Sequence, residues 1–305
     1  MEEPTKRKEK QLPVATILKA WIEYTSGMFR IEQVYSAFPD YSKDPTTKRY
    51  ISTVLSRLVK DGYLERDGAR YGYFRRVEKT LETMDFINAD DKAVDIWLPF
   101  DLAKMVEIMP SNIIIFAGEK ETGKTTLALN IAWANRKTWD VHYFNFEMGR
   151  NELKKRLKKF SDTDLMDWAQ DISFYQRSNA FHDVIQTGLN KLNIIDYIAV
   201  AGDEYPFVSL WIRQIHEKII ETGALCIIFL EKPPGRDTGT GGLGTLDIPR
   251  LYIAVSRGAM KIVTAKNWAN DDNPREKEMT FKIVHGADLI ANSDWVKERK
   301  DRWSG

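Results

Sequence analysis

Apolar residues recur at helical spacing along the first part of the chain. Residues 14–22 place their apolar side chains on one helical face, and residues 31–38 do the same over a shorter stretch. Residues 44–62 predict a longer helix, because Asp44 or Thr46 can cap its start and a glycine closes it. The buried stripe of this third helix is predicted to contain Ile51, Val54, Leu55 and Leu58.

After the third helix, two short β-prone runs flank Asp67 and Gly68, a dipeptide that favours a hairpin turn. Three helices and a basic hairpin in this order resemble a winged helix-turn-helix domain, expected over residues 1–80. The resemblance implies that the third helix enters a major groove and that the hairpin meets phosphates or a minor groove. The residues expected to contact DNA are Lys48, Arg49, Ser52, Thr53, Arg57, Arg66 and Arg70.

Charge distribution favours a DNA partner for this domain. Residues 1–80 carry 16 basic and 11 acidic side chains, whereas the rest of the chain carries 29 basic and 33 acidic ones. The chain's net charge of +1 is therefore the sum of a basic N-terminal domain and a slightly acidic remainder. Two alternatives stay open: many winged helices dock proteins, and a basic helix face can simply be solvated.

The remaining chain predicts a linker, a larger domain and a tail. Residues 81–95 are polar with little periodicity, residues 96–292 alternate apolar strand-like runs with helical ones, and residues 293–305 are highly charged. A short strand and a helix are expected over 96–110.

A phosphate-binding motif lies between a buried strand run and a helix expected over 125–135. The string GEKETGKT fits G-x-x-x-x-G-K-[ST] at Gly118, Gly123, Lys124 and Thr125. The glycines let backbone N–H groups curl around phosphates, the ammonium reaches the outer phosphates, and the hydroxyl can bind Mg²⁺. An accidental turn is disfavoured by this strand–loop–helix context. The predicted ligands are ATP and Mg²⁺, contacted by Gly118, Glu119, Lys120, Glu121, Thr122, Gly123, Lys124, Thr125 and Thr126.

Two further apolar runs end in carboxylates, Glu147 and Asp196. In a phosphate-loop protein, a carboxylate at the end of a neighbouring strand holds Mg²⁺, and a second one can polarise the attacking water. These two residues are therefore expected to join the phosphate loop in one site.

The strings FNFEM, IIDYI and KIVTAKN resemble the motif series of the RecA-like ATPases, most closely the DnaB-type hexameric replicative helicases. The resemblance covers about residues 93–290. It implies an α/β, RecA-like P-loop fold with a mostly parallel sheet. In that fold, Glu147 would activate water and Asp196 would hold Mg²⁺ together with Thr125. It also implies a homo-oligomer with ATP between subunits, where Lys266 approaches the γ-phosphate of a neighbour.

One departure from this pattern concerns the arginine that reaches across the subunit interface, because Trp268 stands in its place. Three explanations stay open: Lys266 works alone, Arg257 or Arg275 substitutes, or hydrolysis is slow.

A second departure follows the apolar run 225–230, where Glu231 replaces the family's glutamine. The loop 232–245 is rich in glycine and proline. The resemblance implies that it faces a central channel and single-stranded DNA, with Lys232 and Arg236 as its cations. The alternative is a flexible surface loop.

Composition is that of a soluble, cytoplasmic protein. No apolar stretch approaches the length of a membrane span, the N-terminus has no apolar signal region, and the lone cysteine, Cys226, lies in an apolar run. We therefore expect an ATP-hydrolysing, DNA-associated ATPase of the RecA/DnaB-like class in replication or recombination, as a helicase-like motor or a helicase-loading factor. The alternatives are an ATP-gated winged-helix regulator with little hydrolysis, and a signalling ATPase with a protein-docking winged helix.

Overall fold

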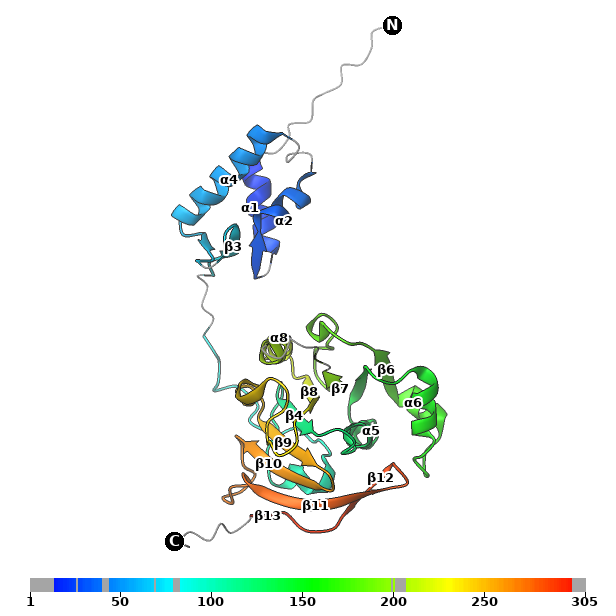
Figure 1. The fold of residues 1–305 in the computed structure, drawn as a ribbon. Helices are drawn as coiled ribbons and strands as arrows, with labels where there is room; N and C mark the ends of the chain where they lie inside the picture. The colour runs from blue at the N-terminus through cyan, green and yellow to red at the C-terminus, as the bar shows by residue number, and fades with distance from the viewer. Residues whose placement is uncertain are drawn as a thin grey trace. The chain divides into compact units, whose positions relative to one another are not determined.

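The computed structural model describes residues 14–25, 27–39, 44–68, 70–78, 83–198, 200 and 207–297. The chain divides into two compact units, Met1–Ala89 and Asp90–Gly305 (Figure 1). Each is described here by itself. No helix among the described residues is long and apolar enough to cross a membrane.

Within its described residues, the N-terminal unit contains three helices and a three-stranded antiparallel sheet with the order β1-β3-β2. The long helix begins where Asp44 caps it, since the carboxylate accepts a hydrogen bond of 2.9 Å from Thr47 N. Strand β1 was not predicted, because three residues carry too little pattern. The elements are α1 (Val14–Tyr24), β1 (Met28–Arg30), α2 (Ile31–Ala37), α4 (Pro45–Lys60), β2 (Leu64–Arg66) and β3 (Tyr73–Arg76).

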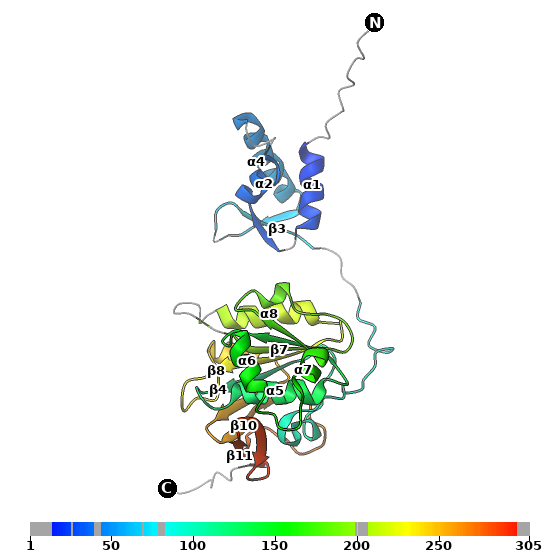
Figure 2. The same ribbon diagram turned by 90° about the vertical axis from the view of Figure 1, so that its right-hand side faces the viewer.

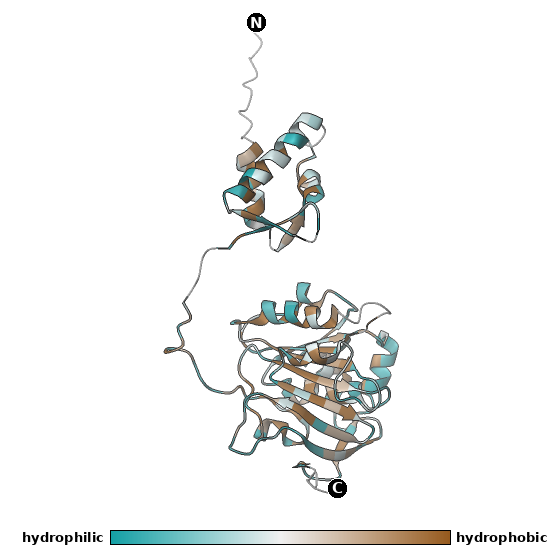
Figure 3. Cartoon of the chain, turned by 60° about the vertical axis from the view of Figure 1, so that its left-hand side comes forward, coloured by the Kyte–Doolittle hydropathy of each residue, from teal (hydrophilic) through white to brown (hydrophobic). Residues whose placement is uncertain are grey.

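The core of this unit forms where α4 packs on α1 and the small sheet. All four apolar residues predicted for the α4 stripe are buried, and Phe29 of β1 stacks on Phe74 of β3 at a centroid distance of 5.9 Å. The opposite face of α4 carries the polar and basic side chains, and Figure 3 shows the two faces by colour.

The C-terminal unit is built on a ten-stranded mixed sheet with the order β12-β11-β10-β9-β4-β8-β7-β5-β6, while β13 pairs with β11. The six strands from β9 to β6 are parallel to one another, so the predicted α/β class with a mostly parallel sheet is confirmed. The strands are β4 (Ile113–Gly118), β5 (Asp140–Asn145), β6 (Ile172–Gln176), β7 (Lys191–Ile198), β8 (Leu225–Glu231), β9 (Leu251–Ser256), β10 (Ala259–Ala265), β11 (Lys277–Val284), β12 (Asp288–Ala291) and β13 (Val296–Lys297).

Helices cover both faces of this sheet, and Figure 2 shows α8 apart from α5, α6 and α7. Alternate residues of β4 point to opposite faces: Ile114 and Phe116 pack with α5, whereas Ile113 and Ile115 pack with α8. The helical elements are η1 (Pro99–Lys104), α5 (Lys124–Asn135), α6 (Arg150–Leu157), α7 (Leu165–Asp171), η2 (Phe181–Asp183), α8 (Val208–Ile219) and η4 (Gly242–Leu246).

The entry to the unit differs from the prediction of a strand and a helix over 96–110. The segment contains the short η1 and a single bridge between Val106 and Trp268, and no strand is assigned there. Phe100 and Asp101 have positive φ angles, which interrupt regular structure after a proline.

The ends of the predicted linker and tail are bonded to the sheet unit. Val94 N donates to Ile108 O at 2.8 Å, and the Trp295 indole donates to Phe100 O at 2.7 Å. The remaining part of the predicted tail, from residue 298, lies outside the described residues.

Candidate nucleotide site

The phosphate loop joins β4 to α5 at the carboxyl edge of the parallel sheet. At Gly118, an added Cβ would lie 2.7 Å from the Cγ of Lys124 and 2.9 Å from the Oγ1 of Thr122. Gly123 has a φ of 89°, and an added Cβ would overlap the Cδ1 of Ile283. The curl of the backbone and its close packing therefore require glycine at both motif positions.

Lys124, the first residue of α5, folds back over the loop. Its Nζ donates to the carbonyl oxygens of Gly118 at 3.1 Å and Glu119 at 2.7 Å. Burial lowers the pKa of Lys124, and neighbouring carboxylates, with Glu231 the strongest, oppose this shift. Phosphate oxygens would offer this ammonium charged acceptors in place of two carbonyls.

Asp196 ends the regular part of β7 and is only 2% exposed. The Tyr143 hydroxyl of β5 donates to its Oδ2 at 2.6 Å. Burial raises the pKa of Asp196, while the Tyr143 and Thr125 hydroxyls and the Lys124 charge favour the carboxylate. Its Oδ1 accepts no hydrogen bond of standard geometry from the described residues. A buried, acceptor-only oxygen near a threonine hydroxyl suits Mg²⁺, so these residues fit the metal.

Glu147 lies in a turn beyond β5 that Asn145 holds in place. Met148 N donates to Asn145 Oδ1 at 3.0 Å, and Asn145 Nδ2 donates to Met148 O. The two residues between them, Phe146 and Glu147, are exposed. Since Asn145 pairs with Asp196 in the β5–β7 register, this turn brings Glu147 to the same sheet edge as Asp196.

The phosphate loop and Glu147 line a cavity of about 500 Å³, and the charge of the buried Asp196 acts on Lys124 in its wall. Sequence reasoning missed Arg156 and Tyr197 as members of its wall. Arg156 belongs to α6, the basic helix that follows Glu147, and its charge favours the carboxylate form of Asp196. The sequence shows that this helix is basic. It does not show which basic side chain faces the site, because that depends on how the helix is rotated about its axis. The lining residues are Lys120, Glu121, Gly123, Lys124, Thr125, Glu147, Arg156, Tyr197 and Glu231.

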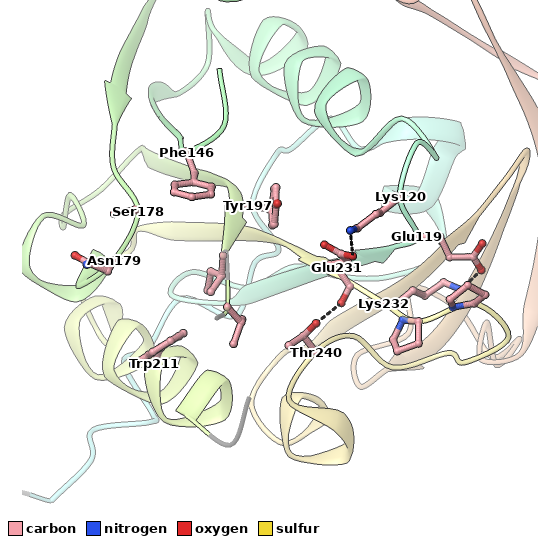
Figure 4. A pocket seen from close by; sticks show the side chains of 14 residues that line it. Glu119, Lys120, Phe146, Ser178, Asn179, Tyr197, Trp211, Glu231, Lys232 and Thr240 are labelled. Atoms are coloured by element: carbon pink, nitrogen blue, oxygen red, sulfur yellow. Dashed lines mark hydrogen bonds and ion pairs between the residues drawn. The ribbon is translucent and has the colours of Figure 1, made fainter. Parts of the chain in front are cut away.

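Two ion pairs tie the phosphate loop to the end of β8, and Figure 4 shows both. Lys120 Nζ lies 3.6 Å from Glu231 Oε1, and Lys232 Nζ lies 2.7 Å from Glu119 Oε1. Lys232 also donates to Ser256 Oγ at 3.1 Å, and its hydrogen bond lowers the pKa of Glu119. The expectation that Lys232 faces DNA is therefore corrected: it is 3% exposed, because it neutralises a carboxylate beside β9.

The residues expected to act from a neighbouring subunit lie outside this cavity. Lys266 Nζ donates to Asp247 O, and the Trp268 indole donates to Ala265 O at 2.9 Å. Burial lowers the pKa of Lys266. Arg257 lies nearer, with its Nη2 3.8 Å from Glu121 Oε2. A role for Lys266 across an interface stays a prediction.

The basic face of the N-terminal unit combines α4 with the hairpin. Arg66 Nη2 donates to Ser56 Oγ at 2.8 Å, and Arg70 Nε pairs with Asp67 Oδ2 at 2.6 Å. Ser52, Ser56, Arg66, Arg70 and Tyr71 help to line a cavity of about 460 Å³. The other predicted DNA contacts on α4, Lys48, Arg49, Thr53 and Arg57, are exposed, as is Arg236 in the core unit.

Comparison with known proteins decides the fold. No family model and no curated protein matches the chain. Among the solved structures that resemble it is a KaiC-like protein from the hyperthermophilic archaeon Pyrococcus horikoshii, with a TM-score of 0.50 and 14% identity. The match covers 66% of this chain and 99% of that chain. The larger unit has a RecA-like fold.

In this RecA-like core, β8 lies between the phosphate-loop strand β4 and the Asp196 strand β7. The core therefore carries its phosphate loop, both carboxylates and Arg156 on one edge. The match does not distinguish DnaB-type helicases from other RecA-like proteins, so that narrower resemblance stays a prediction.

Proposed function

We propose that the RecA-like core binds ATP with Mg²⁺ and hydrolyses it, and that the N-terminal unit is a winged helix that attaches the core to duplex DNA. The observation that carries the proposal is that the phosphate loop and Glu147 line one cavity, while the buried Asp196 lies close enough for its charge to act on Lys124. The proposed setting is replication or recombination, as a helicase-like motor or a helicase-loading factor that works as a homo-oligomer.

Binding would use groups that line or adjoin the cavity. The backbone N–H groups of the loop and the positive end of α5 attract phosphate oxygens. Lys124 exchanges its two loop carbonyls for phosphate oxygens, and Thr125 with Asp196 would hold Mg²⁺. Bound Mg²⁺ supplies Lewis-acid polarisation of the phosphates.

The chemical step would use Glu147 and Arg156. Glu147 is exposed on a rigid turn, so it can orient the attacking water and accept its proton. Arg156 stabilises the negative charge that develops on the transferring phosphoryl group, and it does so from the same subunit. Arg156 would therefore supply the positive charge that the related ATPases obtain from an arginine at the position of Trp268.

One observation favours the ATP-gated regulator as a second candidate. Trp268 occupies the position of the expected arginine and is 44% exposed, with its indole bonded to a local carbonyl. Steady-state turnover with and without single-stranded DNA separates the two functions. A rate that rises steeply with DNA supports the motor, and a negligible rate under both conditions supports the regulator.

The proposal is tested by Lys124→Ala, with Lys218→Ala as a matched control because Lys218 is an exposed lysine of α8. We expect Lys124→Ala to lose most ATP–Mg²⁺ affinity, measured by calorimetry, and the control to keep it. Unchanged affinity of Lys124→Ala would refute the site.

DNA attachment is tested on the full chain with Arg49→Ala and Arg57→Ala combined, since both arginines are exposed on α4. If each contacts a phosphate, the slope of log affinity against log salt falls by about 1.8 in magnitude. An unchanged slope and affinity for duplex DNA would favour the protein-docking alternative.

A further inference from the structure

A second, larger cavity of about 950 Å³ lies at the same sheet edge, beside the phosphate cavity. Figure 4 shows three aromatic side chains around it: Phe146 from the turn after β5, Tyr197 from β7 and Trp211 from α8. Three ring-bearing residues from three different elements therefore line the cavity, and their faces suit a planar guest.

The charges that line this cavity cancel. Its two lysines, Lys120 and Lys232, are paired with its two glutamates, Glu231 and Glu119. The remaining wall consists of aromatic, aliphatic, proline and neutral polar side chains. A phosphate group would find no unpaired cation there, whereas an uncharged polar molecule would leave both ion pairs intact.

The rings are placed to stack on a guest. Phe146 and Tyr197 meet edge to face, with centroids 6.1 Å apart and an interplanar angle of 88°. Phe146 is 36% exposed although it directly follows a buried strand, so part of its apolar surface faces water. Covering that surface with a planar ligand would be favourable.

Hydrogen-bonding groups accompany the rings. Figure 4 draws no hydrogen bond from the Asn179 side-chain amide or the Trp211 indole to the other lining residues, and Ser178, next to Asn179, is exposed. An amide supplies both a donor and an acceptor, which matches the edge of a nucleobase. Aromatic faces combined with such groups are the usual means of holding unpaired bases.

We propose that this cavity binds an unpaired base of a single-stranded nucleic acid. The inference rests on the proposed nucleic-acid function and specifies its ligand. The exposed Arg236 of the following loop is available for the phosphodiester backbone outside the cavity. Tyr197 lines both cavities, and Lys124 Nζ lies 5.7 Å from its ring centroid, so an occupied base site adjoins the phosphate-binding lysine.

The test uses the full chain and an oligothymidylate that carries one fluorescent adenine analogue, whose emission is quenched by stacking. The variants are Trp211→Ala, Trp211→Phe and Asn179→Ala, and Leu210→Ala serves as control because Leu210 is an exposed neighbour on α8. We expect Trp211→Ala to weaken binding about 5- to 160-fold, the loss of one base–aromatic stack, and Trp211→Phe to restore most of it. Asn179→Ala, at an exposed position, weakens binding without a change in melting temperature.

Turnover of ATP without DNA is measured on the same samples. If the parent hydrolyses ATP and binds the oligonucleotide, but every variant binds as the parent does and no quenching occurs, the base site is refuted and the proposed ATPase stands. If Trp211→Ala instead weakens a fluorescent ATP analogue in the absence of oligonucleotide, the cavity holds the base of ATP and the proposal is also overturned. Absence of both turnover and ATP binding in the parent would remove the proposed function itself.

Discussion

Replacing Asp196 by asparagine separates the metal role of this residue from its effect on stability. Asp196 is buried, and its Oδ1 lacks a hydrogen bond of standard geometry from the described residues. A carboxylate in that position costs stability until a cation binds it. The asparagine side chain in Asp196→Asn would keep an acceptor for the Tyr143 hydroxyl and would carry no charge.

The expected change in stability of Asp196→Asn follows from this geometry. Asp196→Asn leaves a buried amide nitrogen where the unpaired Oδ1 was, so the variant removes only the cost of the buried charge, roughly 1–3 kcal/mol. For a domain of roughly 200 residues, this corresponds to a melting temperature that is about 2–12 °C higher in Asp196→Asn than in the parent, without metal or nucleotide. With ATP–Mg²⁺ at about 100 times its Kd, the parent gains about 2.7 kcal/mol, and the variant gains little.

The stability advantage of Asp196→Asn over the parent should depend on pH. Because burial raises the pKa of Asp196 above its ordinary value of 3.8, the folded protein holds this proton more tightly than the unfolded chain does. The contribution of the neutral acid is complete below the ordinary pKa and is lost as pH rises through the folded one. The advantage of Asp196→Asn should therefore grow as pH rises from about 4 towards neutrality.

The assay is thermal unfolding in EDTA and in ATP–Mg²⁺, over a series of pH values. Asp288→Asn, at an exposed position in the same unit, is the control and should change stability by less than about 0.5 kcal/mol. If Asp196→Asn were less stable than the parent in EDTA and still gained the full ATP–Mg²⁺ increment, Asp196 would not be a buried metal ligand.

Three further substitutions address the chemistry and the loop. Glu147→Gln should retain ATP affinity and lose at least about 100-fold in turnover; equal turnover would exclude Glu147 as the proton acceptor. Arg156→Ala should also lower turnover about 100-fold or more, whereas Lys155→Ala on the same helix should not, so equal effects would show that only the charge of α6 matters. Gly123→Ala should cost about 1–2 kcal/mol in its left-handed conformation, since it also displaces Ile283, and should weaken ATP binding; unchanged unfolding and affinity would contradict the loop geometry.

The predictable parts of the site are those set by neighbours in sequence. The phosphate loop, with Lys124 at the start of α5, follows from glycine positions and an adjoining strand and helix. The environment of Lys232 could not be predicted in this way, because a lysine in a glycine- and proline-rich loop is usually an exposed cation. Its partner Glu119 lies 113 residues earlier, and local sequence contains no sign of that pairing.

Arg156 and Asn145 were missed for a related reason. The sequence marks α6 as basic, but which basic residue reaches the cavity depends on how the helix lies against the sheet. Likewise, the sequence shows Asn145 only as a polar residue at the end of a strand. Its hydrogen bond with Met148 N depends on the folded turn, which the sequence does not specify.

By itself, the sequence determined the elements that local physics controls: the capped α4 helix with its apolar stripe, the buried strands, and a loop whose glycines permit the phosphate-binding curl. Tertiary structure decided which distant side chains meet. Parallel strands bring Asp196, Glu147 and the end of β8 to one edge of the sheet. Of the charged residues buried there, Lys232 forms an ion pair with Glu119, whereas the Asp196 carboxylate is proposed to bind a cation. The reason is that the cost of burying a charge depends on its spatial neighbours, which the order of residues along the chain does not specify.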